Sequence, residues 1–436
     1  MNAINNRYIS VGIDVAADFS LICIMSPSFE IIRKPFKVVH TDLDSMTKAV
    51  SAIKKAEEQF QMKSQIFLES TGIFHFPLFC YLRAAGLEVF VLNPLIINSN
   101  KNDNIRKVKN DKLDSKKIAK LGLNPTIKRS LIPNEFVLNL RFLCREYYSL
   151  SDDRIALVNK LGAYVRMVFP AYIGIFSETS GDASMAVLSY TQSLDHLLDA
   201  PKEELVSLIA KIARKGMVYA ENKYNAIINA VTISKEISMH LPNIFGLIHS
   251  TIQHIKLIDE QMDATAKTIE NIVKANSGCE FVKQIHIIDS IVGVGFMSAV
   301  TLMCEIGDFS AFTKPKQLFA FFGLDPSVNE SGKFKGSKNA MSKRGSPLAR
   351  RVLHTVALAC IRNKTNGIPN NPVLQAYYHE KIKSKPKMVA LGAVMHKVCN
   401  IIFALLRDET CFVLITPEEH IRSHNLARSC NLVTAA

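Results

Sequence analysis

The sequence predicts an α/β domain at the N-terminus, a helical middle and a mainly helical C-terminal domain. Short apolar runs bounded by turn residues fill residues 8–93, helical spacing takes over from about residue 135, and glycine-punctuated helices with dense positive charge follow from about residue 285. At roughly 100–200 residues per domain, 436 residues suffice for two or three domains. The expected parts are an N-terminal domain (1–125), a helical region (126–280), a C-terminal domain (281–408) and a tail (409–436).

The N-terminal domain begins with three strands that no helix separates. Alternating and apolar runs predict these strands at residues 8–14, 20–25 and 31–39. Thr41 is the expected N-cap of a helix that runs to Phe60. The remaining elements are expected as a strand at 64–69, a helix at 73–85, a strand at 88–93 and a helix at 111–121. This order, β-β-β-α-β-α-β-α, fits a ribonuclease-H-like sheet better than a doubly wound dinucleotide-binding fold, in which helices separate the first strands.

Charge and composition narrow the classes of function. With 53 Lys and Arg against 39 Asp and Glu, the net charge is +14 and the pI is about 9.3, which favours a polyanionic partner such as nucleic acid. Between Lys314 and Lys364, eleven basic residues accompany two acidic ones, so this segment is the expected nucleic-acid face. We recognise neither a membrane-spanning apolar run nor a secretory signal, and therefore expect a cytoplasmic, nucleoid-associated protein without a membrane partner.

The helical middle contains a long apolar seam. Apolar residues recur at spacings of four and three from Ile248 to Val273, and Asp259 interrupts them. One interpretation is a helix that packs inside its own bundle. The other is a coiled-coil arm that pairs two protomers, and the sequence leaves both interpretations open.

Four carboxylates of the first domain occupy positions that could bring them together. Asp14 and Glu69 each end a predicted strand, and Asp111 and Asp114 lie three residues apart at the start of a predicted helix. Carboxylates at the carboxyl ends of neighbouring strands point into one crevice, and residues three apart share a helix face. Divalent cations would offset the repulsion within such a cluster, and its oxygen ligands suit Mg²⁺ or Mn²⁺. Taken singly, Asp111 could be only an N-cap, and Asp14 and Glu69 only strand-end turn residues.

Basic residues and glycines predict contacts with a nucleic-acid backbone. The stretch from Lys101 to Lys120 holds eight basic and three acidic residues. The glycines of Ile-Val-Gly-Val-Gly, at 291–295, resemble a helix-hairpin-helix turn whose N–H groups could approach a phosphate, although a plain tight turn fits equally well. The expected binding residues are Lys109, Gly293, Gly295, Lys333, Lys335, Lys343, Arg344, Arg350 and Arg351.

Two serines of the C-terminal domain have different expected roles. Ser346 precedes Pro347 and is the expected N-cap of a helix at 348–361. Ser331 has no such local role, because it precedes Gly332 in a lysine-rich loop where a phosphate could be held against its hydroxyl. An ordinary turn serine is the alternative interpretation of Ser331.

These motifs resemble those of the DEDD insertion-sequence transposases related to the Piv pilin-gene invertase, some of which are bridge-RNA-guided recombinases. The resemblance rests on VGIDV, FLESTG and KNDKLD in the first domain and on IVGVG, FFGLDPSVNESGKFKG and MSKRGSPLARRVL in the last. It covers residues 7–123 and 285–406. It implies a RuvC-like first domain in which the catalytic metal ligands are Asp14, Glu69, Asp111 and Asp114.

The resemblance also implies that Ser331, in the Glu-Ser-Gly stretch, is a catalytic residue that forms a covalent link to DNA. A homo-oligomer, dimer or tetramer, is expected because the family's composite sites join one protomer's carboxylates to another's serine. DNA at the element's ends and target, a guide RNA, and Mg²⁺ or Mn²⁺ are the expected partners and cofactor. Two alternatives are a metal-dependent, structure-selective nuclease similar to a Holliday-junction resolvase, in which Ser331 is a bystander, and a DNA-binding protein without catalysis.

Overall fold

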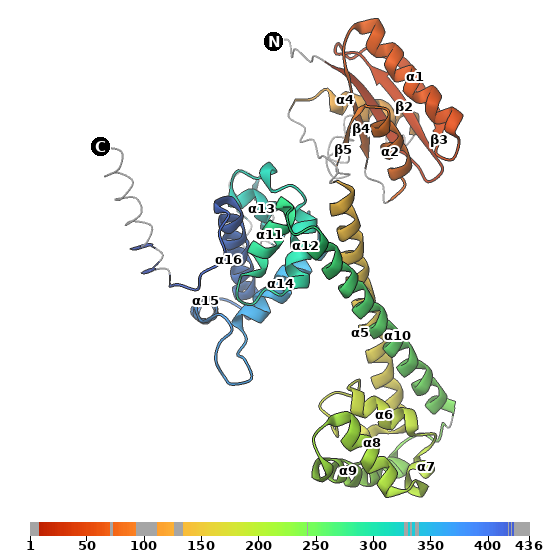
Figure 1. Ribbon diagram of the computed structural model, residues 1–436, viewed down its shortest axis with the longest axis vertical. Coiled ribbons are helices and arrows are strands. Elements are labelled where there is room, and N and C mark those ends of the chain that lie inside the picture. Colours follow the sequence, from red (N-terminus) through yellow and green to blue (C-terminus); the bar gives the residue numbers. More distant parts are fainter. Residues whose placement is uncertain are drawn as a thin grey trace. The chain divides into compact units, whose positions relative to one another are not determined.

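The chain divides into two compact units, Met1–Asn134 and Glu135–Ala436 (Figure 1). The computed structural model describes residues 8–69, 73–92, 111–125, 134–241, 243–326, 330–331, 334–335, 340–416, 418–419 and 421–422. Residues 111, 112, 330, 331, 334 and 335 are described by their backbone alone. The first unit holds a mixed sheet, and helices make up most of the described part of the second.

The first unit is a five-stranded sheet with helices on both faces. Its elements are β1 (Ile9–Val15), β2 (Phe19–Met25), β3 (Ile31–Val39), α1 (Leu43–Phe60), β4 (Ser64–Glu69), α2 (Phe76–Ala84), β5 (Glu88–Leu92) and α4 (Asp111–Gly122). The strand order is β3-β2-β1-β4-β5, in which β1–β2 and β2–β3 pair antiparallel and β1–β4 and β4–β5 pair parallel. The three leading strands are therefore neighbours, and the ribonuclease-H-like fold class is confirmed.

Side chains of the central strands alternate between two covered faces of this sheet. Ile13 of β1 and Leu68 of β4 are fully buried in a core that includes residues of α1 and α2. Because successive strand residues point to opposite faces, Gly12 and Asp14 point to the other face, which α4 covers. The sheet thus brings the carboxyl ends of β1 and β4 under α4.

Helix α1 begins one residue later than the sequence predicts. Asp42, with an extended backbone, is its N-cap, and the Asp42 carboxylate accepts a hydrogen bond from the Asp44 N–H at 3.0 Å. The predicted cap at Thr41 is wrong because two adjacent residues can both cap a helix, and here the second provides the bond. The helix end at Phe60 is confirmed.

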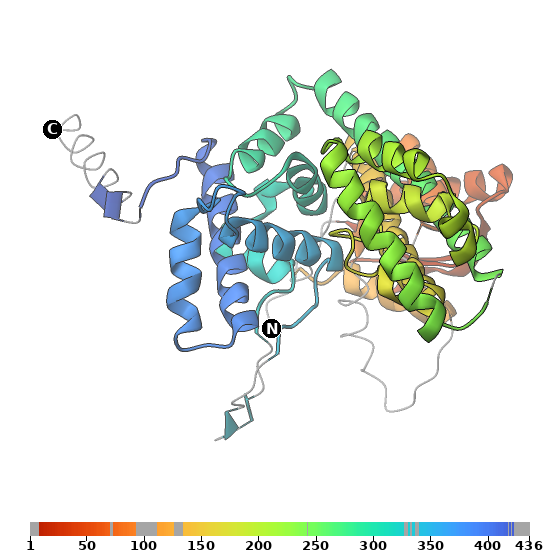
Figure 2. The ribbon, with the colours of Figure 1, turned by 90° about the horizontal axis from the view of Figure 1, so that it is seen from below.

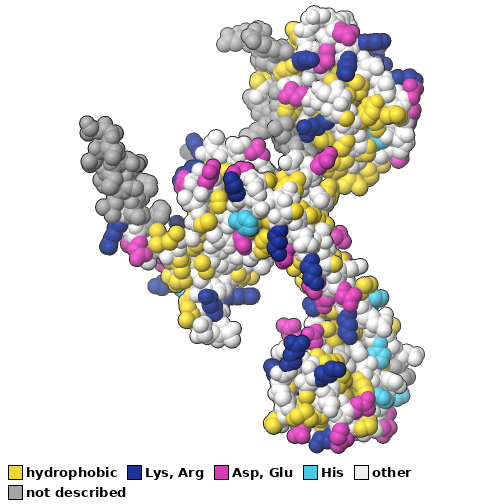
Figure 3. Space-filling model, viewed as in Figure 1, with side chains coloured by type: hydrophobic (Ala, Val, Ile, Leu, Met, Phe, Trp, Pro, Cys, Tyr) yellow, Lys and Arg dark blue, Asp and Glu magenta, His cyan; other side chains and the backbone are white. Residues whose placement is uncertain are grey.

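The second unit contains two helical cores joined by a long helix pair. Its elements are α5 (Glu135–Val168), η2 (Pro170–Tyr172), α6 (Asp182–Tyr190), α7 (Leu194–Asp199), α8 (Lys202–Ala213), α9 (Met217–Ile237), α10 (Asn243–Ala275), α11 (Glu280–Asp289), α12 (Phe296–Ile306), η3 (Phe309–Ala311), α13 (Pro315–Phe321), β6 (Glu330–Ser331), β7 (Phe334–Lys335), α14 (Pro347–Ile361), α15 (Pro372–Ile382) and α16 (Lys387–Asp408). Helices α5 and α10 run side by side (Figure 1) and carry charged side chains of both signs on the face that Figure 3 shows.

The apolar seam of α10 packs within its own chain. Ile252 and Ile255 are buried in the core formed with α6, α8 and α9, whereas Ile269 is buried in the core that contains α11 to α16. Asp259, which interrupts the seam, accepts a hydrogen bond from Arg154 Nε of α5 at 2.5 Å. The interpretation of a helix packed in its own bundle is therefore confirmed, and pairing of protomers through this region stays a prediction.

Helices α14 to α16 belong to the core that also contains α11 to α13, and α15 and α16 lie side by side (Figure 2). Ser346 is the N-cap of α14, as predicted, and its hydroxyl accepts from the Ala349 N–H at 3.2 Å. Helix α16 is the one helix of the described residues that is long and apolar enough to cross a membrane. Half of that apolar stretch is buried in the protein, and its buried residues belong to the core that contains α11 to α16.

Candidate active site

Three contacts fix α4 against β1 on the face that carries Asp14. The Tyr8 hydroxyl donates to the carbonyl oxygen of Gly122 at 2.8 Å, and the Ser10 hydroxyl donates to the carbonyl oxygen of Ala119 at 2.7 Å. At Gly12, an added Cβ would lie 2.1 Å from the backbone nitrogen of Ala119. Only glycine permits this approach of helix to strand, since backbone atoms cannot move aside.

These contacts also set the level of Asp111 along β1. Moving two residues along the strand, from Ser10 to Gly12, moves the contact back along α4 to Ser115, whose carbonyl oxygen lies 2.3 Å from the Cβ position of Gly12. Two strand residues span about 6.6 Å and four helical residues about 6 Å, so the two repeats stay in step. The next step carries the backbone of Asp111, the first residue of α4, to the level of Asp14.

Packing also fixes the position of α4 relative to β4. Ile118 of α4 packs in one cluster with Phe67 of β4 and Phe90 of β5. Asp114 lies one helical turn before Ile118, and Glu69 lies two residues after Phe67 on the same side of β4. This turn of α4 therefore carries Asp114 toward the end of β4 that bears Glu69.

The carboxylates differ in exposure and in partners. Asp114 is 8% exposed, and one of its carboxylate oxygens accepts from Lys117 Nζ at 3.3 Å, whereas Asp14 and Glu69 are half-buried. Among the side chains that the structure describes, no three His, Cys, Asp or Glu residues gather closely enough to hold a metal ion. The Asp111 side chain, the fourth member of the predicted set, lies outside that description.

Ser331 lies on a two-stranded hairpin of the second unit. Strands β6 and β7 pair antiparallel, with Ser331 opposite Phe334. Hydrogen bonds close the neck of the hairpin, where the Ser342 hydroxyl donates to the Asp325 carboxylate at 2.5 Å and the Ser342 N–H donates to the Asp325 carbonyl oxygen at 2.8 Å. These bonds tie together the two chain segments that flank the stretch carrying Ser331.

Two glycines and an arginine brace the same neck. An added Cβ on Gly345 would lie 1.9 Å from the carbonyl oxygen of Phe321, and one on Gly323 would lie 2.4 Å from the Gly345 nitrogen. Arg350 Nη1 donates to the carbonyl oxygens of Phe322 at 3.1 Å and Gly345 at 2.7 Å. The guanidinium thus ties together two chain segments that cross at their glycines.

The other predicted phosphate-binding residues occupy varied positions. Lys343 and Arg344 are exposed beside the hairpin neck, whereas Arg351 Nη1 donates to the Asp152 carboxylate of α5 at 2.7 Å. Gly293, at φ 103°, packs against Cys360, since an added Cβ would lie 2.5 Å from the Cys360 Sγ. Gly295 is the exposed N-cap of α12. Lys109 and Lys333 lie outside the described residues, and Lys335 is described by its backbone alone.

Sequence reasoning missed the residues that hold these parts in place. Gly12 and Ser10 fit α4 to β1, and Gly323 and Gly345 allow the crossing at the hairpin neck. A signal was present in the sequence, because a glycine inside a strand pattern indicates close approach of another backbone. Gly12 is such a glycine, two residues before Asp14.

Two models of known protein families match this chain. A family model of the DEDD type named for insertion sequence IS110, described as a transposase, matches residues 11–170. A second model, described as transposase IS116/IS110/IS902 family, matches residues 285–379, so that the two together match more than half of the chain. The sheet and these two matches define a DEDD-type transposase. The chain belongs to the IS116/IS110/IS902 family of transposases.

Individual relatives agree with this family. The chain is 31% identical over 153 residues to a transposase for insertion sequence element IS1111A of Coxiella burnetii, covering 35% of this chain and 39% of that protein. It is 20% identical over 285 residues to an uncharacterized 44.8 kDa protein of insertion element IS116 from Streptomyces clavuligerus, covering 65% and 67%. It is 29% identical over 126 residues to a probable family 20 transposase of Pseudomonas aeruginosa, covering 28% and 35%.

Proposed function

We propose that the protein cuts and rejoins DNA at the ends of an insertion sequence and at its target. One observation carries this proposal. Asp14 and Glu69 directly follow the paired residues Ile13 and Leu68 on adjacent parallel strands, under the end of α4 that carries Asp111 and Asp114. Membership in a transposase family supports the choice of DNA as the substrate.

The donor set fits a divalent cation. All four residues (Asp14, Glu69, Asp111 and Asp114) are carboxylates, the hard oxygen ligands that Mg²⁺ and Mn²⁺ prefer. Lys117 partly neutralises Asp114, and this ion pair would have to open for Asp114 to act as a ligand. When bound there, the cation would polarise the scissile phosphate and stabilise the charge on the leaving oxygen.

Ser331 is the proposed nucleophile. Its hydroxyl oxygen would attack the phosphorus, its proton would pass to water, and the bond from phosphorus to the 3′ oxygen would break as that oxygen takes up a proton. The phosphoserine–DNA ester keeps the energy of the broken bond, so a 3′ hydroxyl of another strand can displace the serine without ATP. The bond between Asp325 and Ser342 supports this role, because it holds together the two ends of the segment that carries Ser331 and so restricts where the nucleophile can lie.

The remaining parts of the proposal concern partners. Exposed Lys343 and Arg344 beside the hairpin neck would contact the nucleic-acid backbone, which positions DNA without reading its sequence. Sequence choice would then come from a guide RNA. The carboxylates and Ser331 belong to different units, which is compatible with a homo-oligomer whose active sites combine residues of two protomers.

The test is to incubate the full-length protein with the transcript that flanks its element, junction DNA and Mg²⁺, and to look for a protein–DNA adduct on a denaturing gel. Wild type should give an adduct, and Ser331→Ala and Asp14→Asn should not. An adduct that persists in Ser331→Ala would exclude this serine. Metal-dependent cleavage without an adduct in both wild type and Ser331→Ala would indicate the hydrolytic nuclease instead. Wild type that binds but never cleaves would indicate a binding protein.

A further inference from the structure

The α4 face of the sheet extends past Asp14 to a lysine on the edge strand. In the register of the sheet, Asp14 of β1 is paired with Leu21 of β2, and Leu21 is paired with Lys37 of β3. Residues paired across neighbouring strands point to the same face, so Asp14, Leu21 and Lys37 form one row on the side of α4. Two strand spacings put the Lys37 backbone about 10 Å from that of Asp14.

An aromatic ring directs the Lys37 side chain along this face. Lys37 Nζ lies 4.3 Å from the centroid of the Phe19 ring, a cation–π contact. Phe19 is the first residue of β2, directly after the turn that ends β1, and it is the diagonal neighbour of Lys37. The ring therefore holds the ammonium group toward the end of the sheet at which β1 ends and Asp14 lies.

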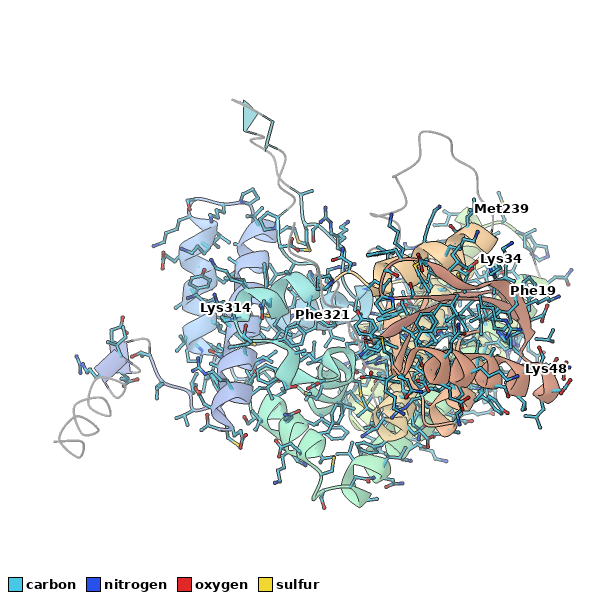
Figure 4. The ribbon with its side chains drawn as sticks, turned by 90° about the horizontal axis from the view of Figure 1, so that it is seen from above. Phe19, Lys34, Lys48, Met239, Lys314 and Phe321 are labelled. Atoms are coloured by element: carbon cyan, nitrogen blue, oxygen red, sulfur yellow. The ribbon has the colours of Figure 1, made fainter. Side chains whose placement is uncertain are left out.

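The charge of Lys37 is available to an anion. Lys37 is exposed, and it takes part in no ion pair among the described residues, whereas Lys48 of α1 pairs with Asp44 at 2.5 Å. Figure 4 shows Phe19 and Lys34 at the β2–β3 side of the sheet and Lys48 on α1, the helix of the opposite face. Lysines and prolines on edge strands such as β3, which contains Pro35, can also serve only to prevent strand pairing. The position of Lys37 in the Asp14 row distinguishes it from that general use.

We propose that Lys37, positioned by Phe19, is a phosphate-binding subsite for the nucleic-acid strand that enters the carboxylate site. A span of about 10 Å is a short distance along a nucleic-acid strand, so Lys37 would hold a phosphate near the scissile one. The contact would position the strand without reading its bases. This inference rests on the proposed function, which supplies the identity of the ligand.

Lysine acetylation footprinting of the full-length protein tests the subsite directly. The probe is duplex DNA that carries an end of the element, in EDTA so that no cleavage occurs, and mass spectrometry follows the acetylation of each lysine. We expect bound DNA to slow acetylation of Lys37 by about fivefold or more and to leave the controls Lys34 and Lys48 within about twofold. Equal rates for Lys37 and Lys34 on the DNA-bound protein would overturn the proposal.

Variants give a second, independent readout. Lys37→Ala should make the fall of log affinity with log salt concentration less steep by about one unit, and Lys37→Arg should preserve the wild-type slope. The matched control Lys34→Ala removes the same charge from the same strand and should leave the slope unchanged; a slope lowered equally by Lys34→Ala would show that only the general charge of β3 acts. Phe19→Leu should weaken Lys37 protection while Lys37 remains present. Absence of any DNA binding by wild type would instead refute the proposed function itself.

Discussion

Asp14 and Glu69 lie next to each other on adjacent parallel strands, each one residue beyond the register pair Ile13 and Leu68. The preceding pair is fully buried against the core that contains α1 and α2, and alternation turns the two carboxylates to the face that α4 covers. Apolar side chains thus pack on both faces of these strands, and the two carboxylates lie at the carboxyl end of the face that α4 covers. Changes to the carboxylates should therefore separate catalysis from stability.

We expect Asp14→Asn and Glu69→Gln to abolish DNA cleavage while the fold is retained. Loss of a carboxylate ligand removes several kcal/mol of transition-state stabilisation, which corresponds to a fall of at least about 1,000-fold in rate. Cleavage rates and thermal melting measure the two effects. The control is Glu88→Gln. Glu88 is exposed and begins β5, whereas Asp14 and Glu69 lie near the ends of their strands, and the Glu88 carboxylate accepts a hydrogen bond from Gln65 Nε2 at 2.8 Å. A variant at Asp14 with more than about a tenth of wild-type activity would contradict the assignment.

Gly12→Ala should destabilise the first unit and displace α4. The added Cβ would meet backbone atoms of Ser115 and Ala119, which cannot rotate away, so either the helix or the strand has to shift. Overpacking of this kind costs about 1–3 kcal/mol or more. Urea unfolding measures the loss of stability, and DNA cleavage should fall as well because α4 carries Asp111 and Asp114.

Gly162→Ala is the matched control for that substitution. Gly162 lies inside α5, where an added Cβ would meet no atom within 4 Å. Alanine should there stabilise the protein by roughly 0.5–1 kcal/mol, since glycine is a poor helix former. Equal effects of the two substitutions would show that close packing of α4 on β1 does not decide the outcome at Gly12.

Much of the fold follows from local patterns in the sequence. Each predicted strand of the first unit is present, because apolar alternation records which face of a strand is buried. The N-cap at Ser346 follows from a serine placed directly before a proline. The partner of the α10 seam does not follow, because spacing shows that a helix has an apolar face and not which helix covers it. That partner is α5 of the same chain, and the ion pair of Asp259 with Arg154 marks it.

Some features of the candidate site could likewise be predicted from local patterns, and others could not. The pairing of β1 with β4 puts Asp14 and Glu69 at neighbouring strand ends, whereas the described side chains of Asp14, Glu69 and Asp114 do not come together closely enough to hold a metal ion, so the metal site stays a prediction. The bracing of the hairpin neck by Arg350 could not be predicted, because its two acceptors are carbonyl oxygens brought together only by the crossing at Gly323 and Gly345. From the sequence alone, a basic residue within a basic segment that bonds to the protein's own backbone cannot be distinguished from one that binds phosphate.

Arg145→Ala should lower the stability of the second unit by about 2 kcal/mol. Glu305 of α12 is buried, with its side chain 5% exposed, and both of its carboxylate oxygens accept from Arg145 of α5, at 2.9 and 3.2 Å. Removal of Arg145 leaves the buried carboxylate without its hydrogen-bonded ion pair, and the nearby charge of Arg141 together with the half-exposed position of Arg145 keeps the loss below the 3–5 kcal/mol typical of fully buried pairs. Urea unfolding is the measurement. Arg407→Ala, which breaks an exposed pair with Asp408, should change stability by less than about 1 kcal/mol.

Buried thiols should make the protein less stable in alkali. Burial raises the pKa of Cys360 to about 11 and that of Cys399 to about 12, from an ordinary value of 9.0. Because the folded state favours the neutral thiol, this stabilisation is fully present below about pH 9 and is lost as the pH rises toward the folded-state pKa. Above about pH 9, each thiol should lower the free energy of unfolding, measured in urea, by up to about 1.4 kcal/mol per pH unit. Cys399→Ala should reduce this slope and the exposed Cys80→Ala should not, whereas an unchanged slope in Cys399→Ala would show that the Cys399 thiol is not the source.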